Sequence, residues 1–420
     1  MKLLYVLLDG VGDRPNPSLG GKTPLQAART PGLDGLASRG VSGLVYTVGK
    51  GIAPESDVAV FSMLGYSFGS EYPGRGVIEA VGTGADFQDG DLALRANFAT
   101  VDPSMNIIDR RAGRNLTQEE GGKLASEVAD GVRLSFPGSS FSFIHTLSHR
   151  AVLTFRVQGE ALSGDITNTD PAYAKVGGMG VAKEKITEMK PMECRSLDGA
   201  RGSTLGASLV NEFVEKSHNI LEASPVNATR RSRGFEPANI VLTRDAGSKL
   251  PKVEPISEKY RASFAIVADM PVELGIGKLT GMEVFVSKGV FDYEDKLNKV
   301  RELLKKFDVV YLHIKGPDEP GHDGEAAAKA KSLEAIDIGF FVPLVASGSL
   351  AGVAVAVSAD HSTPCTMRAH SDDPVPLLLS RDDGRGDGTT RFTEAEAARG
   401  SLGVLKGPDV LRLALEFARS

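Results

Sequence analysis

The feature that most constrains the fold is a set of short, almost uninterrupted apolar runs. They cover residues 3–8, 309–314 and 353–358. Runs of this length without polar alternation are typical of parallel strands that helices cover on both faces. Stretches with a helical spacing of apolar residues alternate with them, at 295–306, 325–335 and 409–417. This alternation predicts an α/β fold built on an open, mostly parallel sheet.

Polar side chains lie near the points where these predicted strands end. Asp9 follows the first run, and Asp360 and His361 follow the third. Asp318 comes shortly after the second run. Because ligands bind outside the carboxyl ends of the strands in such sheets, these four residues are expected at one ligand-binding edge.

The length of the chain predicts two domains. One hydrophobic core rarely grows beyond about 250–300 residues, and this chain has 420. The first run and the C-terminal third share the strand–helix pattern, whereas the middle has many short segments broken by Gly, Pro and Asn. We therefore predict a discontinuous domain of residues 1–69 and 270–420, with a smaller α+β domain of residues 70–269 inserted into it.

Charge and composition limit the partners. The net charge is −6 and no segment is strongly basic, which argues against nucleic acid or an anionic membrane as the main partner. The first apolar run is too short for a signal peptide, and no uncharged run approaches the roughly 18–20 residues of a membrane span. Cys194 and Cys365 lie far apart and fit two reduced thiols. A cytoplasmic protein is expected, and its oligomeric state stays open.

Seven scattered residues are candidates for binding metal ions. Carboxylate and imidazole ligands together suit Zn, Mn and related divalent ions. Pro320 and Gly321 are expected to break any helix, which predicts a shaped loop around them. The seven candidates are Asp9, Ser56, Asp318, His322, Asp360, His361 and His370.

Each candidate also has an ordinary structural explanation. A lone histidine is usually a surface or core residue, and Ser56 before Asp57 is typical of a helix N-cap. Three of the seven histidines, however, lie beside or near aspartates in the C-terminal third, and this grouping favours metal binding. A serine at a helix start is also held rigidly near backbone N–H groups that can face a phosphate. Coordination to a divalent ion would make its hydroxyl a nucleophile.

Seven motifs together resemble those of the archaeal-type cofactor-independent phosphoglycerate mutases, within the alkaline phosphatase superfamily. They occur in the order of the family over nearly the whole chain, and their combination is far more specific than any one of them. The motifs are LLDGVGDRP (7–15), ESDVAVFSMLGY (55–66), YPGRGVIEAVG (72–82), IIDRRAGR (107–114), HIKGPDEPGHDG (313–324), SADHSTPC (358–365) and HSDDPVP (370–376).

The resemblance implies an alkaline-phosphatase-like sheet between helices and two divalent cations, manganese first, with zinc, cobalt or magnesium as alternatives. The residues that would hold one cation are Asp318, His322 and His370. Those that would hold the other are Asp9, Asp360 and His361, with Ser56 beside them as the phosphorylated nucleophile.

The resemblance also implies that the inserted domain binds the glycerate part of 3-phosphoglycerate. The substrate-binding candidates are His149, Arg150, Arg230 and Arg233, and Arg111, Arg114 and Arg244 are further arginines that could face the cleft. The spacing of Arg230 and Arg233 would put both on one face of a helix. Asp165 or Asp170 would be the acid/base group, and Lys278 would neutralise the phosphoryl group. The ordinary alternatives are solvated arginines and aspartates that form turns.

The predicted function is the interconversion of 3-phosphoglycerate and 2-phosphoglycerate in glycolysis and gluconeogenesis, through a phosphoserine and without 2,3-bisphosphoglycerate. The only expected partner is a small-molecule substrate. The nearest alternatives are a metal-dependent phosphatase, a phosphonate hydrolase or a phosphopentomutase. A non-catalytic metal-binding protein is a further alternative, but a purely structural site would not need Ser56.

Overall fold

The computed structural model describes residues 2–68, 72–176, 179–183, 189–346, 348 and 350–420. The chain divides into two compact units. Unit 1 comprises Met1–Ser67 and Val253–Ser420, and unit 2 comprises Phe68–Lys252. Among the described residues, no helix is both long and apolar enough to cross a membrane.

Unit 1 is built on an eight-stranded sheet in the order β11-β10-β12-β1-β13-β14-β2-β15. β14 is antiparallel to both of its neighbours, and the other pairings are parallel. The central strands β1, β12 and β13 are buried along their whole length, which accounts for their uninterrupted apolar sequences. The strands are β1 (Leu3–Leu8), β2 (Gly40–Tyr46), β10 (Phe264–Ala268), β11 (Glu283–Val286), β12 (Val309–Ile314), β13 (Ala354–Ala359), β14 (Val375–Ser380) and β15 (Gly403–Lys406).

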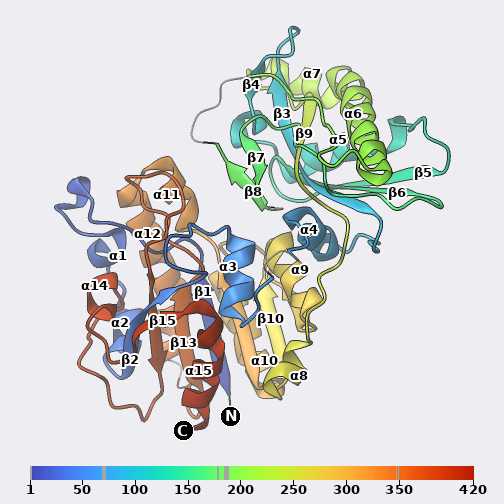
Figure 1. The fold of residues 1–420 in the computed structure, drawn as a ribbon. Helices are drawn as coiled ribbons and strands as arrows, with labels where there is room; N and C mark the ends of the chain where they lie inside the picture. Colours follow the sequence, from blue (N-terminus) through green and yellow to red (C-terminus); the bar gives the residue numbers. More distant parts are fainter. Residues whose placement is uncertain (1, 69–71, 177–178, 184–188, 347, 349) are drawn as a thin grey trace. The chain divides into compact units, whose positions relative to one another are not determined.

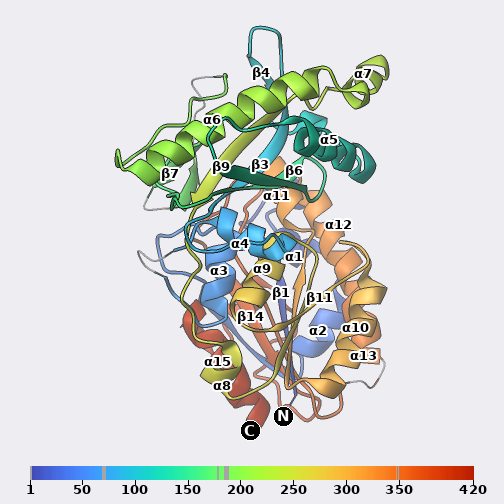
Figure 2. The same cartoon turned by 90° about the vertical axis from the view of Figure 1, so that its right-hand side faces the viewer.

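Helices cover both faces of this sheet (Figures 1 and 2). α3 (Ser56–Met63), α9 (Pro271–Leu279) and α15 (Gly407–Arg419) pack on one face, and α2 (Pro31–Ala37) and α10 (Tyr293–Lys306) pack on the other. A π-helical turn at Asp337–Phe341 joins α12 to α13 beside α2 and α10. The remaining helices of unit 1 are α1 (Pro24–Ala27), α8 (Ile256–Tyr260), α11 (Asp318–Asp323), α12 (Ala326–Ile336), α13 (Val342–Ala346) and α14 (Glu394–Ala397).

Unit 2 has an antiparallel sheet in the order β4-β3-β6-β5, in which β9 also pairs with β3. Helix α4 packs on one face, and α5 and α6 pack on the other. The strands are β3 (Leu92–Val101), β4 (Ile107–Asp109), β5 (Ser139–His145), β6 (Arg150–Val157) and β9 (Ile240–Gly247), with a separate hairpin of β7 (Tyr173–Val176) and β8 (Met179–Ala182). The helices are α4 (Arg75–Thr83), α5 (Gln118–Gly131), α6 (Arg201–Glu222) and α7 (Pro225–Ser232).

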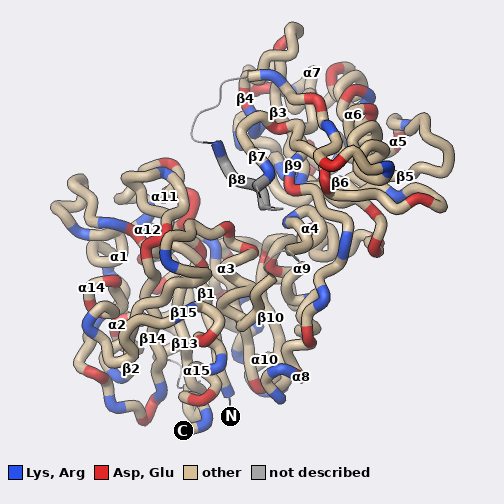
Figure 3. The backbone as a smooth tube through the Cα atoms, in the orientation of Figure 1, with Lys and Arg blue, Asp and Glu red and all other residues tan. Residues whose placement is uncertain are grey.

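This architecture confirms the predicted fold class, an α/β sheet between helices together with a smaller α+β unit. One predicted boundary is wrong. Residues 253–269 were expected in the inserted domain, but β10 pairs with β12 and β11 in the large sheet and therefore belongs to unit 1. Acidic and basic residues are interspersed along the described parts of both units (Figure 3).

Phe213 is central to the core of unit 2. Its side chain is fully buried on α6, and its ring centroid lies 5.2, 5.4 and 5.9 Å from those of Phe141, Phe143 and Phe155. Phe213→Ala would leave a cavity among these rings. We expect it to lower the free energy of unfolding of unit 2 by about 3–5 kcal/mol in urea denaturation. Leu197→Ala, at an exposed position, is the control, and equal losses in both variants would contradict the prediction.

Candidate active site

The register of the large sheet brings together residues from distant parts of the chain. β1 lies between β12 and β13, and Leu8 is paired with Ile314 on one side and Ala359 on the other. The next residues along the three strands are Asp9, Lys315 and Asp360. Neighbouring strands lie about 4.8 Å apart, so these side chains emerge at one edge of the sheet. This is the carboxyl edge predicted from the sequence.

Three further segments reach the same group. Ser56 is the first residue of α3, after the N-cap residue Glu55, so it is not itself the N-cap. Asp318 begins α11, and His370 lies between β13 and β14. The predicted loop around Pro320 is wrong, because Asp318–Asp323 forms a short helix. Proline is tolerated there because N–H groups in the first turn have no partner within the helix.

The first part of the site surrounds Asp318. Its Oδ1 atom lies 3.5 Å from His370 Nε2 and 3.6 Å from His322 Nε2. The rings of His370 and His361 are stacked with their centroids 3.7 Å apart. Ligand atoms of Asp318, His361 and His370 all lie within 4.8 Å of one another. This geometry can accommodate a metal ion.

The second part surrounds Asp9. His361 Nε2 lies 3.6 Å from Asp9 Oδ1 and 3.4 Å from Asp360 Oδ2. Ligand atoms of Asp9, His313 and Asp360 lie within 4.8 Å of one another. Asp9 Oδ1, Asp360 Oδ2 and His313 Nε2 are buried and have no hydrogen-bond partner among the described residues. Buried carboxylate oxygens without donors are costly unless a cation satisfies them, so this part also fits a metal ion.

The hydroxyl of Ser56 belongs to this cluster. Its Oγ atom lies 3.0 Å from Nε2 of His361, and both residues are buried. The seven predicted residues thus form one continuous group within unit 1. His361 contacts both parts of the group, and His313 lies with Asp9 and Asp360. His322 is the most exposed of the histidines in the group, with 39% of its side chain accessible.

Protonation within the cluster follows from burial and charge. Burial, followed by the neighbouring carboxylate of Asp9, raises the pKa of Asp360 well above its usual range. Burial and the nearby His370 lower the pKa of His361, so its ring is neutral, as a ligand requires. Burial opposes protonation of His370, but its hydrogen bond and charge interaction with Asp318 raise its pKa to about 9.

Sequence reasoning missed three residues at this edge: Lys315, Glu273 and His313. Lys315 Nζ lies 2.7 Å from Glu273 Oε1 and 3.3 Å from Asp9 Oδ2. Burial lowers the pKa of Lys315, but Asp9 and Glu273 outweigh this effect and raise it, so Lys315 remains a cation. Its place in the 313–324 motif, next to the end of an apolar run, was a usable signal. Glu273, in the first turn of α9, gave none.

Lys278 does not have the predicted environment. It is exposed in the last turn of α9. That helix follows β10 and runs back from the carboxyl edge, so its last turn points away from the edge where Asp9 lies. Lys315 contacts Asp9 and is a second candidate for the charge-neutralising role predicted for Lys278.

Arg230 in unit 2 has a structural environment. Its side chain is completely buried, and it donates hydrogen bonds to the Glu236 carbonyl at 2.9 Å, Glu120 Oε2 at 2.9 Å and the Ala112 carbonyl at 3.2 Å. Arg233 is exposed at the C-cap of α7. The two arginines therefore share no face, because one lies on the inner side of the helix and the other lies beyond its end. The prediction that they bind substrate as a pair is wrong.

The two candidate acid/base residues also differ. Asp170 is buried and accepts hydrogen bonds from Arg110 at 2.7 and 2.9 Å and from Arg244 at 3.4 Å. Burial raises its pKa, but these arginines outweigh it and lower the pKa overall, so Asp170 is held as a carboxylate and is a poor proton shuttle. Asp165 is exposed, with Ser163 Oγ at 3.2 Å.

His149 lies among basic side chains in unit 2. It is buried at the turn before β6. Burial and the charges of Arg150, Arg244, Arg114 and Arg95 lower its pKa to about 3, so the ring is neutral. It lies beside several arginines, of which Arg95 and Arg244 are partly balanced by Asp245 and Asp170. Such a surrounding favours anionic ligands.

Arg110 and Tyr173 join this basic group although the sequence did not single them out. The guanidinium carbon of Arg244 lies 4.1 Å from the Tyr173 ring centroid, and that of Arg110 lies 5.2 Å from it. One ring therefore packs against two arginines that also hold Asp170.

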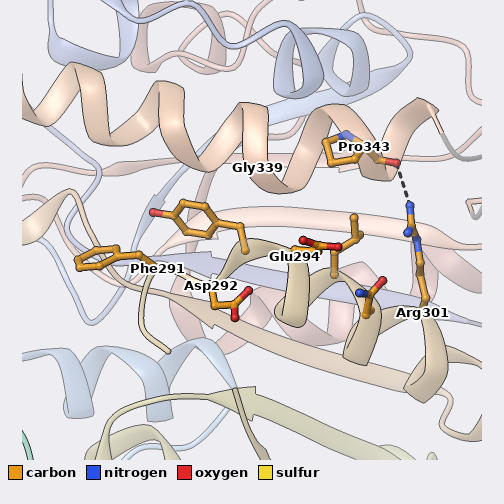
Figure 4. Close-up of a pocket in the computed structure, with 9 residues that line it drawn as sticks. Phe291, Asp292, Glu294, Arg301, Gly339 and Pro343 are labelled. Carbon is orange, nitrogen blue, oxygen red and sulfur yellow. Dashed lines mark hydrogen bonds between the residues drawn. The ribbon is translucent and has the colours of Figure 1, made fainter. Parts of the chain in front are cut away.

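A hollow elsewhere in unit 1 lies between α10 and the π-helical turn (Figure 4). Arg301 donates a hydrogen bond of 3.0 Å to the Pro343 carbonyl on its wall. Its lining contains none of the predicted site residues, and we assign it no part in the chemistry.

Comparison with known proteins identifies the family. A sequence model of the family described as 2,3-bisphosphoglycerate-independent phosphoglycerate mutase matches residues 37–227. The protein of that name from Aeropyrum pernix is 42% identical over 417 residues, which cover 97% of each chain. The chain belongs to this family. The mutase from Methanopyrus kandleri is 38% identical, over 99% of this chain and 96% of that protein.

Solved structures agree with this assignment. The cofactor-independent phosphoglycerate mutase from Thermoplasma acidophilum is 30% identical, with a TM-score of 0.61 over the whole of both chains. A Pyrococcus horikoshii protein is also 30% identical, with a TM-score of 0.76 over 100% of this chain and 97% of that chain. The predicted family and the enzyme class of phosphoglycerate mutase are thereby confirmed.

The raised pKa of His370 gives this mutase a testable pH dependence. A folded-state pKa of about 9 against an ordinary value of about 6.5 stabilises the chelator-treated protein. This stabilisation is complete below about pH 6.5 and is lost as the pH rises through about 9, and it amounts to at most roughly 3 kcal/mol. We expect the difference in unfolding free energy between wild type and His370→Asn to shrink over this interval in urea titrations. A difference in unfolding free energy that stays constant over this pH interval would contradict the raised pKa of His370.

Proposed function

We propose that this chain interconverts 3-phosphoglycerate and 2-phosphoglycerate through a phosphoserine at Ser56, with two divalent cations bound at the carboxyl edge of the large sheet. The observation that carries the proposal is the 3.0 Å approach of Ser56 Oγ to His361 Nε2 within a cluster of buried carboxylates and imidazoles. A structural metal site would have no use for a serine hydroxyl, whereas phosphoryl transfer needs a nucleophile there.

The donor sets fit two cations. Asp318, His322 and His370 would hold one, and Asp9, Asp360 and His361 would hold the other, with His313 close to the second. Mixed carboxylate and imidazole ligands suit manganese, which we propose first, and also zinc, cobalt and magnesium. When bound, the cations supply Lewis-acid polarisation of the phosphoryl oxygens and favour the deprotonated serine.

Ser56 is suited to attack because its backbone is fixed. It is the first residue of a helix, and the residue is 7% exposed. In the forward reaction its Oγ atom forms a bond to phosphorus while the bond from phosphorus to the 3-oxygen of the substrate breaks. The 2-hydroxyl of the retained glycerate then attacks the phosphoserine, and the serine oxygen leaves. The N–H groups of the first turn of α3 favour negative charge on the phosphoryl group.

Lys315 keeps this edge of the sheet electrostatically balanced. Its ammonium group lies between Asp9 and Glu273. This contact fixes the direction of the Asp9 carboxylate. We propose that Lys315, by orienting Asp9, lowers the free energy of the transition state for phosphoryl transfer.

We propose that unit 2 binds the glycerate part of the substrate. The basic surroundings of His149 and Arg150 support this role, because a carboxylate is recognised well by guanidinium groups. Arg110 and Arg244 belong to the same group of side chains. Asp165 remains the proposed acid/base residue, since Asp170 is engaged by arginines.

Water must be excluded while the phosphoserine exists, because hydrolysis would turn the mutase into a phosphatase. As a glycolytic enzyme, it is proposed to work in the cytoplasm.

The nucleophile is tested by Ser56→Ala. We expect this variant to lower kcat by at least about 10³-fold, because it removes the proposed nucleophile. A coupled assay of 2-phosphoglycerate formation without 2,3-bisphosphoglycerate measures it, and chelator treatment should abolish the wild-type rate. Ser62→Ala is the matched control on the same helix, where the hydroxyl donates to the Thr47 carbonyl. Near-normal mutase activity of Ser56→Ala would rule out the covalent route.

The choice between two lysines is tested by Lys315→Met and Lys278→Met. Because Lys315 contacts Asp9 and Lys278 lies in the last turn of α9, we expect the first variant to lose about 10²-fold in kcat/KM. The second should stay within about threefold of wild type, since exposed substitutions outside a site have small effects. Thermal unfolding of both variants checks that they are folded. A larger loss of kcat/KM in Lys278→Met than in Lys315→Met would instead support the role predicted for Lys278.

A further inference from the structure

A completely buried lysine lies beside the candidate cation centre. Lys329 on α12 is 0% exposed, and its Nζ atom donates to Asp13 Oδ2 at 2.9 Å, the Thr363 carbonyl at 2.9 Å and the Gly12 carbonyl at 3.1 Å. The side chain of Asp13 is also 0% exposed. Neither Lys329 nor Asp13 is among the candidate ligands. Burying such a pair removes two charges from water, and an apolar pair of similar volume is often as stable.

The acceptors of Lys329 lie on the two loops that carry candidate ligands. Gly12 and Asp13 follow Asp9, and Thr363 follows Asp360 and His361. Asp13 strengthens the connection, because both of its carboxylate oxygens lie 3.2 Å from the Cys365 amide nitrogen. The amide of Thr363 also donates to the Gly12 carbonyl at 2.9 Å. The lysine and the aspartate therefore join the ends of the two loops.

Thr363 connects this pair directly to the ligands. Its Oγ1 atom donates to Asp318 Oδ1 at 2.7 Å and lies 3.1 Å from His361 Nδ1. The threonine held through its carbonyl by Lys329 thus orients two candidate ligands through its hydroxyl. Packing around it is close, because a Cβ atom at Gly321 would lie 2.7 Å from the Thr363 carbonyl oxygen.

We propose that the Lys329–Asp13 pair is a positioning device that holds the ligand-bearing loops in their binding arrangement before the cations arrive. This inference rests on the cation centre of the proposed function. Asp9 and Asp360 lie on the two loops that Lys329 and Asp13 join, and Thr363 on the second loop contacts Asp318. A pair that fixes the two loops opposes their separation. The loops then lose less conformational entropy when a cation binds. Loss of the pair should therefore weaken cation affinity more than turnover at saturating cation.

A second buried pair in unit 1 provides a matched control. Lys296 is also 0% exposed, lies 2.9 Å from Asp269 Oδ2, and donates to the Gly289 and Val290 carbonyls at 2.7 and 2.9 Å. It has the same chemistry as Lys329, but its acceptors lie on segments without candidate ligands. A purely structural role would make the two pairs equivalent.

The experiment compares Asp13→Asn/Lys329→Met with Asp269→Asn/Lys296→Met in the full chain. Both partners are changed because a single change would leave one charge buried alone. Each protein is treated with chelator, and Mn²⁺ is then added in a calorimetric titration. We expect the first variant to bind Mn²⁺ at least about tenfold more weakly than wild type, as is usual for residues that orient ligands. The control should stay within about twofold, and at saturating Mn²⁺ the first variant should recover most of its kcat.

Equal Mn²⁺ affinity in the two variants would overturn the inference. Failure of the wild type to bind Mn²⁺ would instead overturn the proposed function. A second measurement does not depend on the folding of either variant. In chelator-treated wild type, the amides of Thr363 and Cys365 should already exchange slowly with deuterium, because the loops are held without cations. Rapid exchange that slows only when Mn²⁺ is added would overturn the positioning role.

Discussion

The structure of the site depends on the close approach of two buried carboxylates. The parallel register of β1 and β13 pairs Leu8 with Ala359, so Asp9 and Asp360 leave the sheet side by side. Burying two like charges so close together is unfavourable. Burial first, and then the neighbouring Asp9, raise the pKa of Asp360. Neighbouring positive or neutral groups at this edge, among them Lys315 and His361, can be understood as compensation for that approach.

Three lysines of unit 1 show how the same side chain serves different purposes. Lys315 contacts Asp9 and Glu273 at the edge of the sheet, whereas Lys329 is buried beneath the ligand-bearing loops. Lys296 is buried equally deeply but joins segments without candidate ligands. Since all three have carboxylate partners, the ion pair itself does not distinguish them. The distinction lies in which segments of chain each pair connects.

The arginines of unit 2 divide in a similar way. Arg230 donates its hydrogen bonds to carbonyl groups and to Glu120 in the core. Arg244 and Arg110 instead pack on Tyr173 and bind Asp170. The result is a basic region around a neutral His149. In the proposed function, this region would bind the anionic glycerate part, and the proposed cation centre in unit 1 would bind the phosphoryl group. Two different kinds of anion recognition would then be divided between two separately packed units.

The sequence by itself predicted the parallel sheet and the place of Asp9, Asp318, Asp360 and His361 at its carboxyl edge, because an apolar run followed by a polar residue is a local pattern with a predictable place in such a sheet. Ser56, His322 and His370 were candidates because of their residue types and their neighbours in the sequence. Only the tertiary structure decided that Asp318 begins a helix, that Glu273 and His313 belong to the site and that Arg230 does not. These outcomes depend on partners far away in the chain, such as Glu120 for Arg230. Local periodicity records which side of an element is buried, but it does not record which group will satisfy a buried charge.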